Sequence, residues 1–121
     1  MTVGLWCAVA AVGGCGALAR FLLDATVGGR FGRTFPFGTF VVNLTGAFIL
    51  GLLSGASLAP NTLLVAGTAT VGSYTTFSTW MLESQRLTEE GAVRATAVNL
   101  LLSIVAGVAS AALGRAIGAR L

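Results

Sequence analysis

The chain has 121 residues, of which 55% are hydrophobic and only 9% are charged, and its mean hydropathy is +0.90. A soluble domain carries about 25% charged residues, so this chain has too few ions to cover a surface in water. It contains no histidine, which excludes an imidazole base and a histidine-bound metal. Its 7 basic and 4 acidic residues are too few and too scattered for nucleic-acid binding. The composition therefore indicates an integral membrane protein.

A membrane-spanning helix needs about 20 mostly apolar residues, and four stretches of the sequence meet this requirement. They cover about residues 3–23, 37–59, 62–82 and 93–119. The connections between them are short, so we expect one all-α transmembrane domain over residues 1–121 with four transmembrane helices. Four spans place the second loop on the same side of the membrane as both ends of the chain.

Glycines recur at helical spacing in two of these stretches. Gly51 and Gly55 form one small-xxx-small pattern, and Gly114 and Gly118 form another. In lipid, such residues let two helix backbones approach closely. Packing within one chain is the simpler interpretation, and packing between two subunits is the alternative.

The arginines are distributed unequally between the two sides. Five lie toward the side of the first and third loops, counting Arg20 near the end of the first helix, and two lie toward the other side. The positive-inside rule places the first and third loops in the cytoplasm. The bias is modest once Arg20 is set aside, so it does not fix the orientation.

The third stretch is unusual for a membrane helix. From residue 67 to 79 it reads GTATVGSYTTFST, and eight of these thirteen residues carry a hydroxyl group. Single Ser and Thr residues are tolerated in helices because they bond back to a preceding carbonyl. A run this dense, with Gly72 near its centre, favours a helix broken near its centre over a continuous one. Irregular backbone at membrane depth must be buried in protein or line a wet cavity, so we expect the functional site here.

Polar side chains also occur in the second and fourth stretches. Thr39 and Asn43 are four residues apart, as are Asn99 and Ser103, so each pair lies on one helix face. Such groups either join two helices or face a pathway. No acidic or basic residue lies in the middle of a span, and a neutral pathway of weak donors suits a small ion that must also leave.

Two aromatic residues follow the polar run. Phe77 and Trp80 are three apart and share a helix face beside the expected break. Core packing is the commoner role for such a pair. Because the edge of an aromatic ring is electropositive, an alternative role is to contact an anion without trapping it.

These residues resemble those of the Fluc (CrcB-type) fluoride channels, small four-helix proteins of bacterial membranes. The resemblance is carried by GGCGALARF (13–21), GTFVVNLTGAFILGLL (38–53) and GTATVGSYTTFSTWMLES (67–84). It implies a fluoride-specific channel in the cell membrane that exports F⁻ passively and so reduces fluoride toxicity. It also implies an antiparallel dimer, one subunit inverted relative to the other, with two narrow pores.

The resemblance further implies roles for individual residues. The backbone carbonyls of Gly72 and Thr75 would hold a structural sodium ion that is not transported. Arg20 matches the arginine near the end of the family's first helix, and Arg20 and Thr39 are assigned to structural or vestibule positions. The implied fluoride pore contains Asn43, Phe77, Trp80, Thr76, Ser78, Asn99 and Ser103.

One departure from the family pattern matters. Trp80 stands at the second phenylalanine position, so the pore there is narrower or offers an indole N–H instead of a ring edge. Together with the unequal distribution of the arginines, Trp80 leaves a second interpretation open. In this interpretation, the chain is a non-conducting or half-pore subunit of a heterodimer with a similar chain. A small multidrug exporter needs a glutamate inside the first helix, which has none. An enzyme is excluded because no nucleophile–base pair or metal cluster can be assembled.

Overall fold

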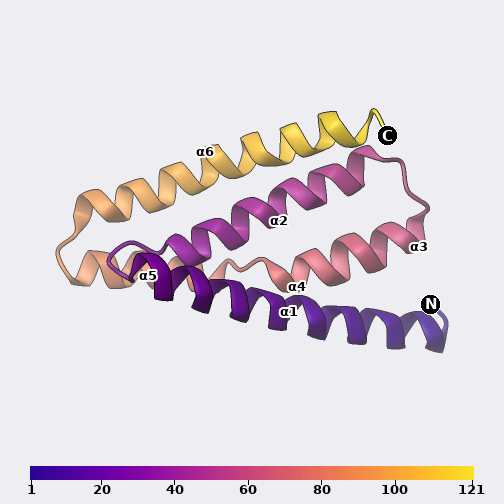
Figure 1. Cartoon of the computed structure of the whole chain (residues 1–121), viewed down its shortest axis with the longest axis horizontal. Coiled ribbons are helices and arrows are strands. Elements are labelled where there is room, and N and C mark those ends of the chain that lie inside the picture. The colour runs from indigo at the N-terminus through magenta and orange to yellow at the C-terminus, as the bar shows by residue number, and fades with distance from the viewer.

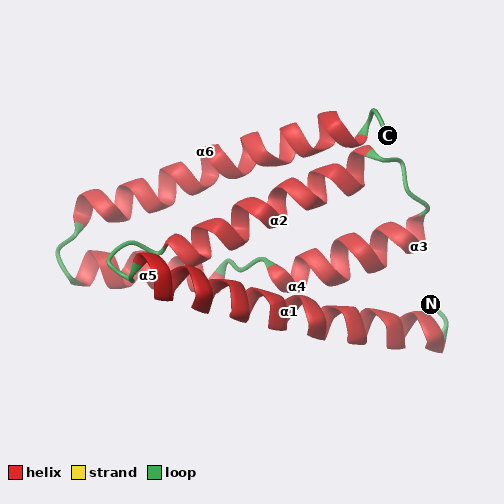
Figure 2. Ribbon diagram, in the orientation of Figure 1, coloured by secondary structure: helices red, strands yellow, loops and turns green.

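The computed structural model describes residues 1–121 and contains only helices and their connections (Figure 1, Figure 2). Three helices, α1, α2 and α6, are each long and apolar enough to cross a membrane. The remaining segment is divided into shorter pieces. This confirms the predicted all-helical class. The elements are α1 (Val3–Phe31), α2 (Phe37–Gly55), α3 (Pro60–Thr62), the π-helix η1 (Leu63–Val71), α4 (Gly72–Tyr74), α5 (Ser78–Glu89) and α6 (Val93–Gly118).

The segments run back and forth along the long axis of the molecule. Figure 1 shows the N-terminus, the α2–α3 connection and the C-terminus at one end, and the α1–α2 and α5–α6 connections at the other. The segment from α3 to α5 runs opposite to α2 and α6 as a single traverse. This is the arrangement expected from four successive membrane crossings.

The first helix is longer than its apolar window of residues 3–23. α1 continues through Asp24 to Phe31, so most of the expected loop is helical. The carboxylate of Asp24 lies 3.6 Å from the guanidinium of Arg33, which supplies a counter-charge for it near the end of the helix. The helix stops before Gly32, whose φ of 75° lies in the left-handed region that glycine adopts without strain.

The two glycine patterns pack α2 against α6. A β-carbon at Gly51 would collide with the backbone of Ala111 on α6, and one at Gly114 would collide with the Phe48 carbonyl on α2. Gly55 and Gly118 approach the opposite helix equally closely. The small-xxx-small patterns therefore bring the two backbones together within one chain, as the simpler interpretation expected.

Substituting Gly114 with alanine tests this packing. The added methyl group meets the Phe48 carbonyl, so Gly114→Ala should lower the free energy of unfolding by about 1–3 kcal/mol, the usual effect of overpacking. Thermal and chemical denaturation in detergent, followed by circular dichroism, measures the change. Gly107→Ala is the matched control, because nothing lies within 4 Å of a β-carbon at that position of the same helix. Equal stability of the two variants would show that the seam is not tightly packed.

Candidate functional site

The helical hydrogen bonding of the third segment is interrupted at residues 75–77. α4 ends at Tyr74, Thr75 has an extended conformation with φ −76° and ψ 159°, and α5 begins at Ser78. Figure 2 shows this interruption as a loop between two helical stretches. Gly72, at which the sequence places the centre of the polar run, is itself helical, with φ −63° and ψ −34°. The chain leaves the helix only after Tyr74.

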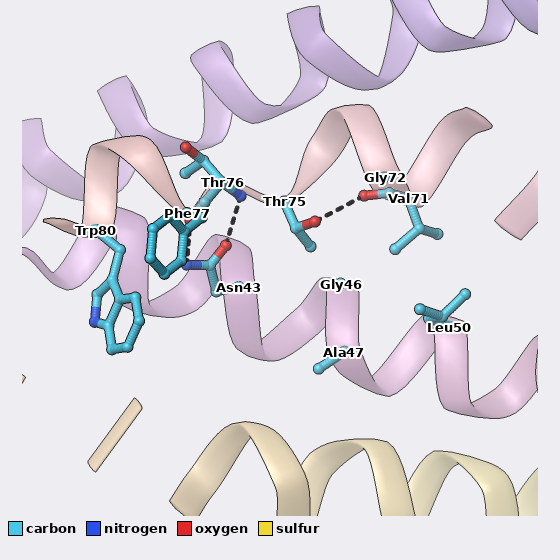
Figure 3. A pocket seen from close by; sticks show the side chains of 10 residues that line it. All are labelled: Asn43, Gly46, Ala47, Leu50, Val71, Gly72, Thr75, Thr76, Phe77 and Trp80. Carbon is cyan, nitrogen blue, oxygen red and sulfur yellow. Dashed lines mark hydrogen bonds between the residues drawn. The ribbon is translucent and has the colours of Figure 1, made fainter. Parts of the chain in front are cut away.

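Asn43 on α2 pairs with the backbone of the interruption through both ends of its side-chain amide. Its Nδ2 donates to the Thr76 carbonyl at 2.9 Å, and the Thr76 N–H donates to its Oδ1 at 2.8 Å. Figure 3 shows these two bonds between the amide and the interrupted backbone at Thr76. One amide thus replaces two backbone partners that Thr76 would have in a continuous helix. The second hydrogen of Nδ2 remains available to another acceptor.

The same contacts remove the helical donors of two carbonyl groups. In a continuous helix the Thr76 N–H would donate to the Gly72 carbonyl, but here it donates to Asn43. The Thr79 N–H would donate to the Thr75 carbonyl, but it donates to Thr76 Oγ1 at 3.2 Å. The carbonyls of Gly72 and Thr75 are therefore left without their helical partners. Unwound carbonyls of this kind are ligands for Na⁺ in membrane proteins.

An open pocket of about 330 Å³ lies beside the interruption, between α2 and the third segment (Figure 3). None of the residues that line it is charged. The ring of Phe77 is 70% exposed and meets Trp80 edge to face, with centroids 5.7 Å apart and an interplanar angle of 69°. Asn43, Gly46, Ala47, Leu50, Val71, Gly72, Thr75, Thr76, Phe77 and Trp80 line the pocket.

Gly46 lets the interruption approach α2. A β-carbon on Gly46 would collide with the methyl group of Thr75 and would lie 3.2 Å from the ring of Tyr74. The Tyr74 hydroxyl hydrogen bonds to Thr45 Oγ1 at 2.8 Å. These contacts hold the end of α4 against α2, one turn along α2 from Asn43. Gly46 belongs to the stretch 38–53 that carries the family resemblance, but sequence reasoning assigned it no structural role.

Trp80 is connected to α6 and to the next turn of α5. Its indole N–H donates to the Asn99 carbonyl at 3.2 Å, and the Ser84 hydroxyl donates to the Trp80 carbonyl at 2.8 Å. The side-chain amide of Asn99 donates to Ser84 Oγ at 2.9 Å. The sequence allows Trp80 either to narrow the pore or to offer its indole N–H there. In the structure this N–H is bonded to α6 instead of facing the pocket. Ser84 was missed because one serine near the end of a span forms no pattern.

The predicted residues fall into a pocket group and a peripheral group. Gly72, Thr75, Thr76, Phe77, Trp80 and Asn43 come together in the pocket. Ser78 begins α5, with its hydroxyl 3.5 Å from Thr76 Oγ1. Asn99 and Ser103 lie on α6 outside the pocket lining, and Asn99 Oδ1 and Ser103 Oγ are buried without a hydrogen-bond partner. Thr39 is buried on α2, and Arg20 is half-buried on α1 and forms no ion pair.

The ion pairs of the structure lie at the end of the molecule with the α1–α2 and α5–α6 connections. Arg86 lies 2.9 Å from Glu83 and 3.0 Å from Glu90, and it donates to the Arg33 carbonyl at 2.9 Å. Hydrogen bonds to Glu83 and Glu90 raise the pKa of the Arg86 guanidinium above its ordinary value. This network joins α5 to the α1–α2 connection. None of its charged groups lines the pocket.

Comparison with known proteins gives consistent matches. The family described as CrcB-like protein, Camphor Resistance (CrcB), matches residues 7–115. "Fluoride-specific ion channel FluC 2" of Mycolicibacterium paratuberculosis is 53% identical over 114 residues, covering 94% of this chain and 93% of that protein. The protein of the same name from Mycobacterium tuberculosis is 50% identical over 115 residues, covering 95% and 91%. "Fluoride-specific ion channel FluC 1" of Symbiobacterium thermophilum is 43% identical over 119 residues, covering 93% and 96%.

Replacing Asn43 tests its role at the interruption. Asn43→Leu keeps the side-chain shape but leaves the Thr76 N–H and carbonyl unpaired, which costs about 1–3 kcal/mol for each buried group. We expect amide hydrogen exchange in a peptide spanning residues 75–80 to accelerate by roughly tenfold or more, measured by mass spectrometry in detergent.

Thr45→Val is the matched control on the same helix. It removes the bond to Tyr74 without touching Thr76, so exchange at residues 75–80 should stay close to that of the unmodified chain. If Asn43→Leu also left exchange unchanged, Asn43 would not be what holds the interruption in place.

Proposed function

The chain belongs to the CrcB-like family, and on that premise we propose that it is a fluoride-specific ion channel through which F⁻ leaves the bacterial cytoplasm down its gradient. Passive efflux of this kind reduces fluoride toxicity. The channel is a multi-pass membrane protein, and we assign it to the bacterial cell membrane. The observation that carries the proposal is the uncharged pocket at residues 75–77, where an amide, hydroxyl groups and aromatic edges converge.

An uncharged pathway suits a small anion that must enter and leave quickly. Removing an ion from water is expensive unless other dipoles replace its hydration shell, whereas a fixed counter-charge would hold it too tightly. The free hydrogen of Asn43 Nδ2 and the hydroxyl of Ser78 are neutral donors at the interruption. The hydroxyl of Thr76 is engaged with Thr79 at 3.1 Å, so it steadies the turn and contributes less as a donor. The exposed ring of Phe77 adds electropositive C–H groups.

The proposed pathway continues along α6 and ends at a vestibule. Ser103 Oγ has no partner in the chain, so its hydroxyl can donate to a passing anion. Asn99 Oδ1 also lacks a partner but can only accept, so it suits water that hydrates the ion. We assign Arg20 and Thr39 to the vestibule, where the positive charge of Arg20 attracts anions.

The working unit that we propose is an antiparallel dimer with two pores. One chain supplies only one wall of the pathway, because the pocket is open and the Phe77 ring is largely exposed. A second, inverted copy would bring an equivalent interruption against the first at the middle of the membrane. We propose a homodimer, and a heterodimer with a similar chain is the alternative that reconstitution separates.

A structural sodium ion fits the residues at the interruption. The carbonyls of Gly72 and Thr75 have lost their helical donors to Asn43 and Thr76, and carbonyl oxygens of this kind suit Na⁺. We propose that these two residues of each subunit hold the ion. When bound, it would offset the partial negative charges of these carbonyl oxygens, and it would not be transported.

Reconstitution tests the proposed activity. Purified chain in liposomes loaded with sodium fluoride and sodium chloride, with an ionophore that lets the cation leave, should release F⁻ down its gradient while retaining Cl⁻, measured with ion-selective electrodes. The pocket supports selective passage because its donors are few and neutral. If the chain alone is silent but conducts with a second FluC-type chain, it is a half-pore subunit. If both preparations retain fluoride, the channel assignment is wrong.

Replacing Phe77 tests the aromatic edge. Phe77→Ile removes the electropositive ring hydrogens and keeps an apolar side chain. Since an aromatic edge contact is worth about 1 kcal/mol, fluoride flux should fall roughly five- to tenfold, while size-exclusion chromatography shows the same oligomer. Phe31→Ile, at the end of α1 and outside the pocket, is the control and should leave flux unchanged. Equal flux in both variants would remove Phe77 from the pathway.

A further inference from the structure

Three hydrogen bonds close a ring between α5 and α6, which we call the indole latch and define by Trp80, Ser84 and Asn99. The indole N–H of Trp80 donates to the Asn99 carbonyl at 3.2 Å. The amide of Asn99 donates to Ser84 Oγ at 2.9 Å, and Ser84 Oγ donates to the Trp80 carbonyl at 2.8 Å. The Ser84 side chain thus links the Trp80 carbonyl to the Asn99 side chain, and the Asn99 backbone carbonyl accepts from the indole.

Two of the three latch residues are buried, and Trp80 is half-buried. Asn99 is 1% exposed and Ser84 is 5% exposed. Hydrogen bonds in surroundings of low dielectric are strong and support one another, and a partner lost there is not replaced by solvent. Ser84 and Asn99 lie outside the lining of the pocket and are bonded to Trp80, and the side-chain nitrogen of Asn99 is bonded to Ser84.

The latch decides which part of Trp80 faces the pocket. The indole nitrogen is taken up by α6, and Figure 3 shows it on the side of the ring turned away from Asn43. The carbon part of the ring lies against Phe77, edge to face. Trp80 therefore presents to the pathway the same chemistry as a phenylalanine, namely ring carbon and hydrogen.

Resting on the proposed fluoride function, we propose that Ser84 and Asn99 are positioning residues that withhold the indole N–H of Trp80 from the fluoride pathway. An N–H group bonded to an anion forms a charge-assisted hydrogen bond, about twice as strong as a neutral one. A free indole N–H beside the pathway would bind fluoride and delay its release. In the latch, this N–H is bonded to the Asn99 carbonyl. The contact between the Trp80 ring and the ion therefore stays weak enough for conduction.

A nuclear magnetic resonance experiment tests the latch without any need for transport. The chain has two tryptophans, so Trp6→Phe leaves Trp80 as the only source of an indole signal. In ¹⁵N-labelled protein, that signal should not move when fluoride is added, because its N–H is already bonded. Ser84→Ala removes the two bonds that hold Asn99 beside Trp80, so the indole N–H should separate from the Asn99 carbonyl and its signal should then shift with fluoride. An indole that responds to fluoride in the chain with the latch intact overturns the proposal.

Flux measurements test the consequence for conduction. Ser84→Ala should lower fluoride flux roughly tenfold, the effect of a stronger donor holding the ion. Adding Trp80→Phe to this variant should restore most of the flux, because no indole N–H remains to be released. A merely structural defect would not be repaired in this way. Failure of Trp80→Phe to restore flux overturns the proposal, and Asn99→Leu provides a second variant if Ser84→Ala does not fold.

Thr88→Val is the matched control. It removes the hydrogen bond between the Thr88 and Thr96 hydroxyls, 3.1 Å apart, which also joins α5 to α6. It also removes the bond from the Thr88 hydroxyl to the Ser84 carbonyl, but no bond to the Ser84 side chain or to the indole. Its flux and its indole signal should equal those of the unmodified chain. If the unmodified chain conducts no fluoride, the proposed function fails, while the indole signal still decides whether the latch holds the N–H.

Discussion

The constraint on which the structure depends is that backbone polar groups inside a membrane must find partners within the protein. The interruption at residues 75–77 removes helical bonds in the middle of a mostly apolar chain. The Asn43 amide meets this need at Thr76, donating to its carbonyl and accepting from its N–H. The Thr76 side chain does the same for the next turn by accepting from the Thr79 N–H. The interruption is therefore held by two polar side chains rather than tolerated as local disorder.

This arrangement also requires close packing, which explains the position of several glycines. Asn43 reaches Thr76 because Gly46, one turn along α2, lets Thr75 and Tyr74 lie against the helix backbone. Farther along the same helix, Gly51 and Gly55 lie against α6. The first half of α2 thus contacts the interruption, and the second half of α2 contacts α6. A single helix with small residues on both faces positions the donors and the wall of the pocket.

Sequence reasoning anticipated the elements whose signals repeat and missed those that depend on one contact. The four apolar windows predicted the helical segments, and the glycine pairs 51/55 and 114/118 predicted close helix packing within one chain but not that α2 and α6 are the two helices that meet. The hydroxyl-rich run marked the segment that is interrupted, but Gly72 did not mark the position. The helix ends only where Thr76 exchanges a helical bond for a distant amide, a contact between residues 33 positions apart. α1 likewise continues past its apolar window to Phe31, in a stretch where Asp24 pairs with Arg33.

The same reasoning explains how a tryptophan can stand in a pathway that needs weak contacts. An indole carries both a ring edge and a strong donor, and the sequence cannot say which of the two faces an ion. In the structure, the answer depends on Ser84 and Asn99, which lie four and nineteen residues from Trp80 and form no pattern with it. The chemical character of the pocket is therefore set by buried residues behind its wall. In the proposed fluoride pathway, a tryptophan at this position needs an acceptor for its indole N–H, and the Asn99 carbonyl is that acceptor in the structure.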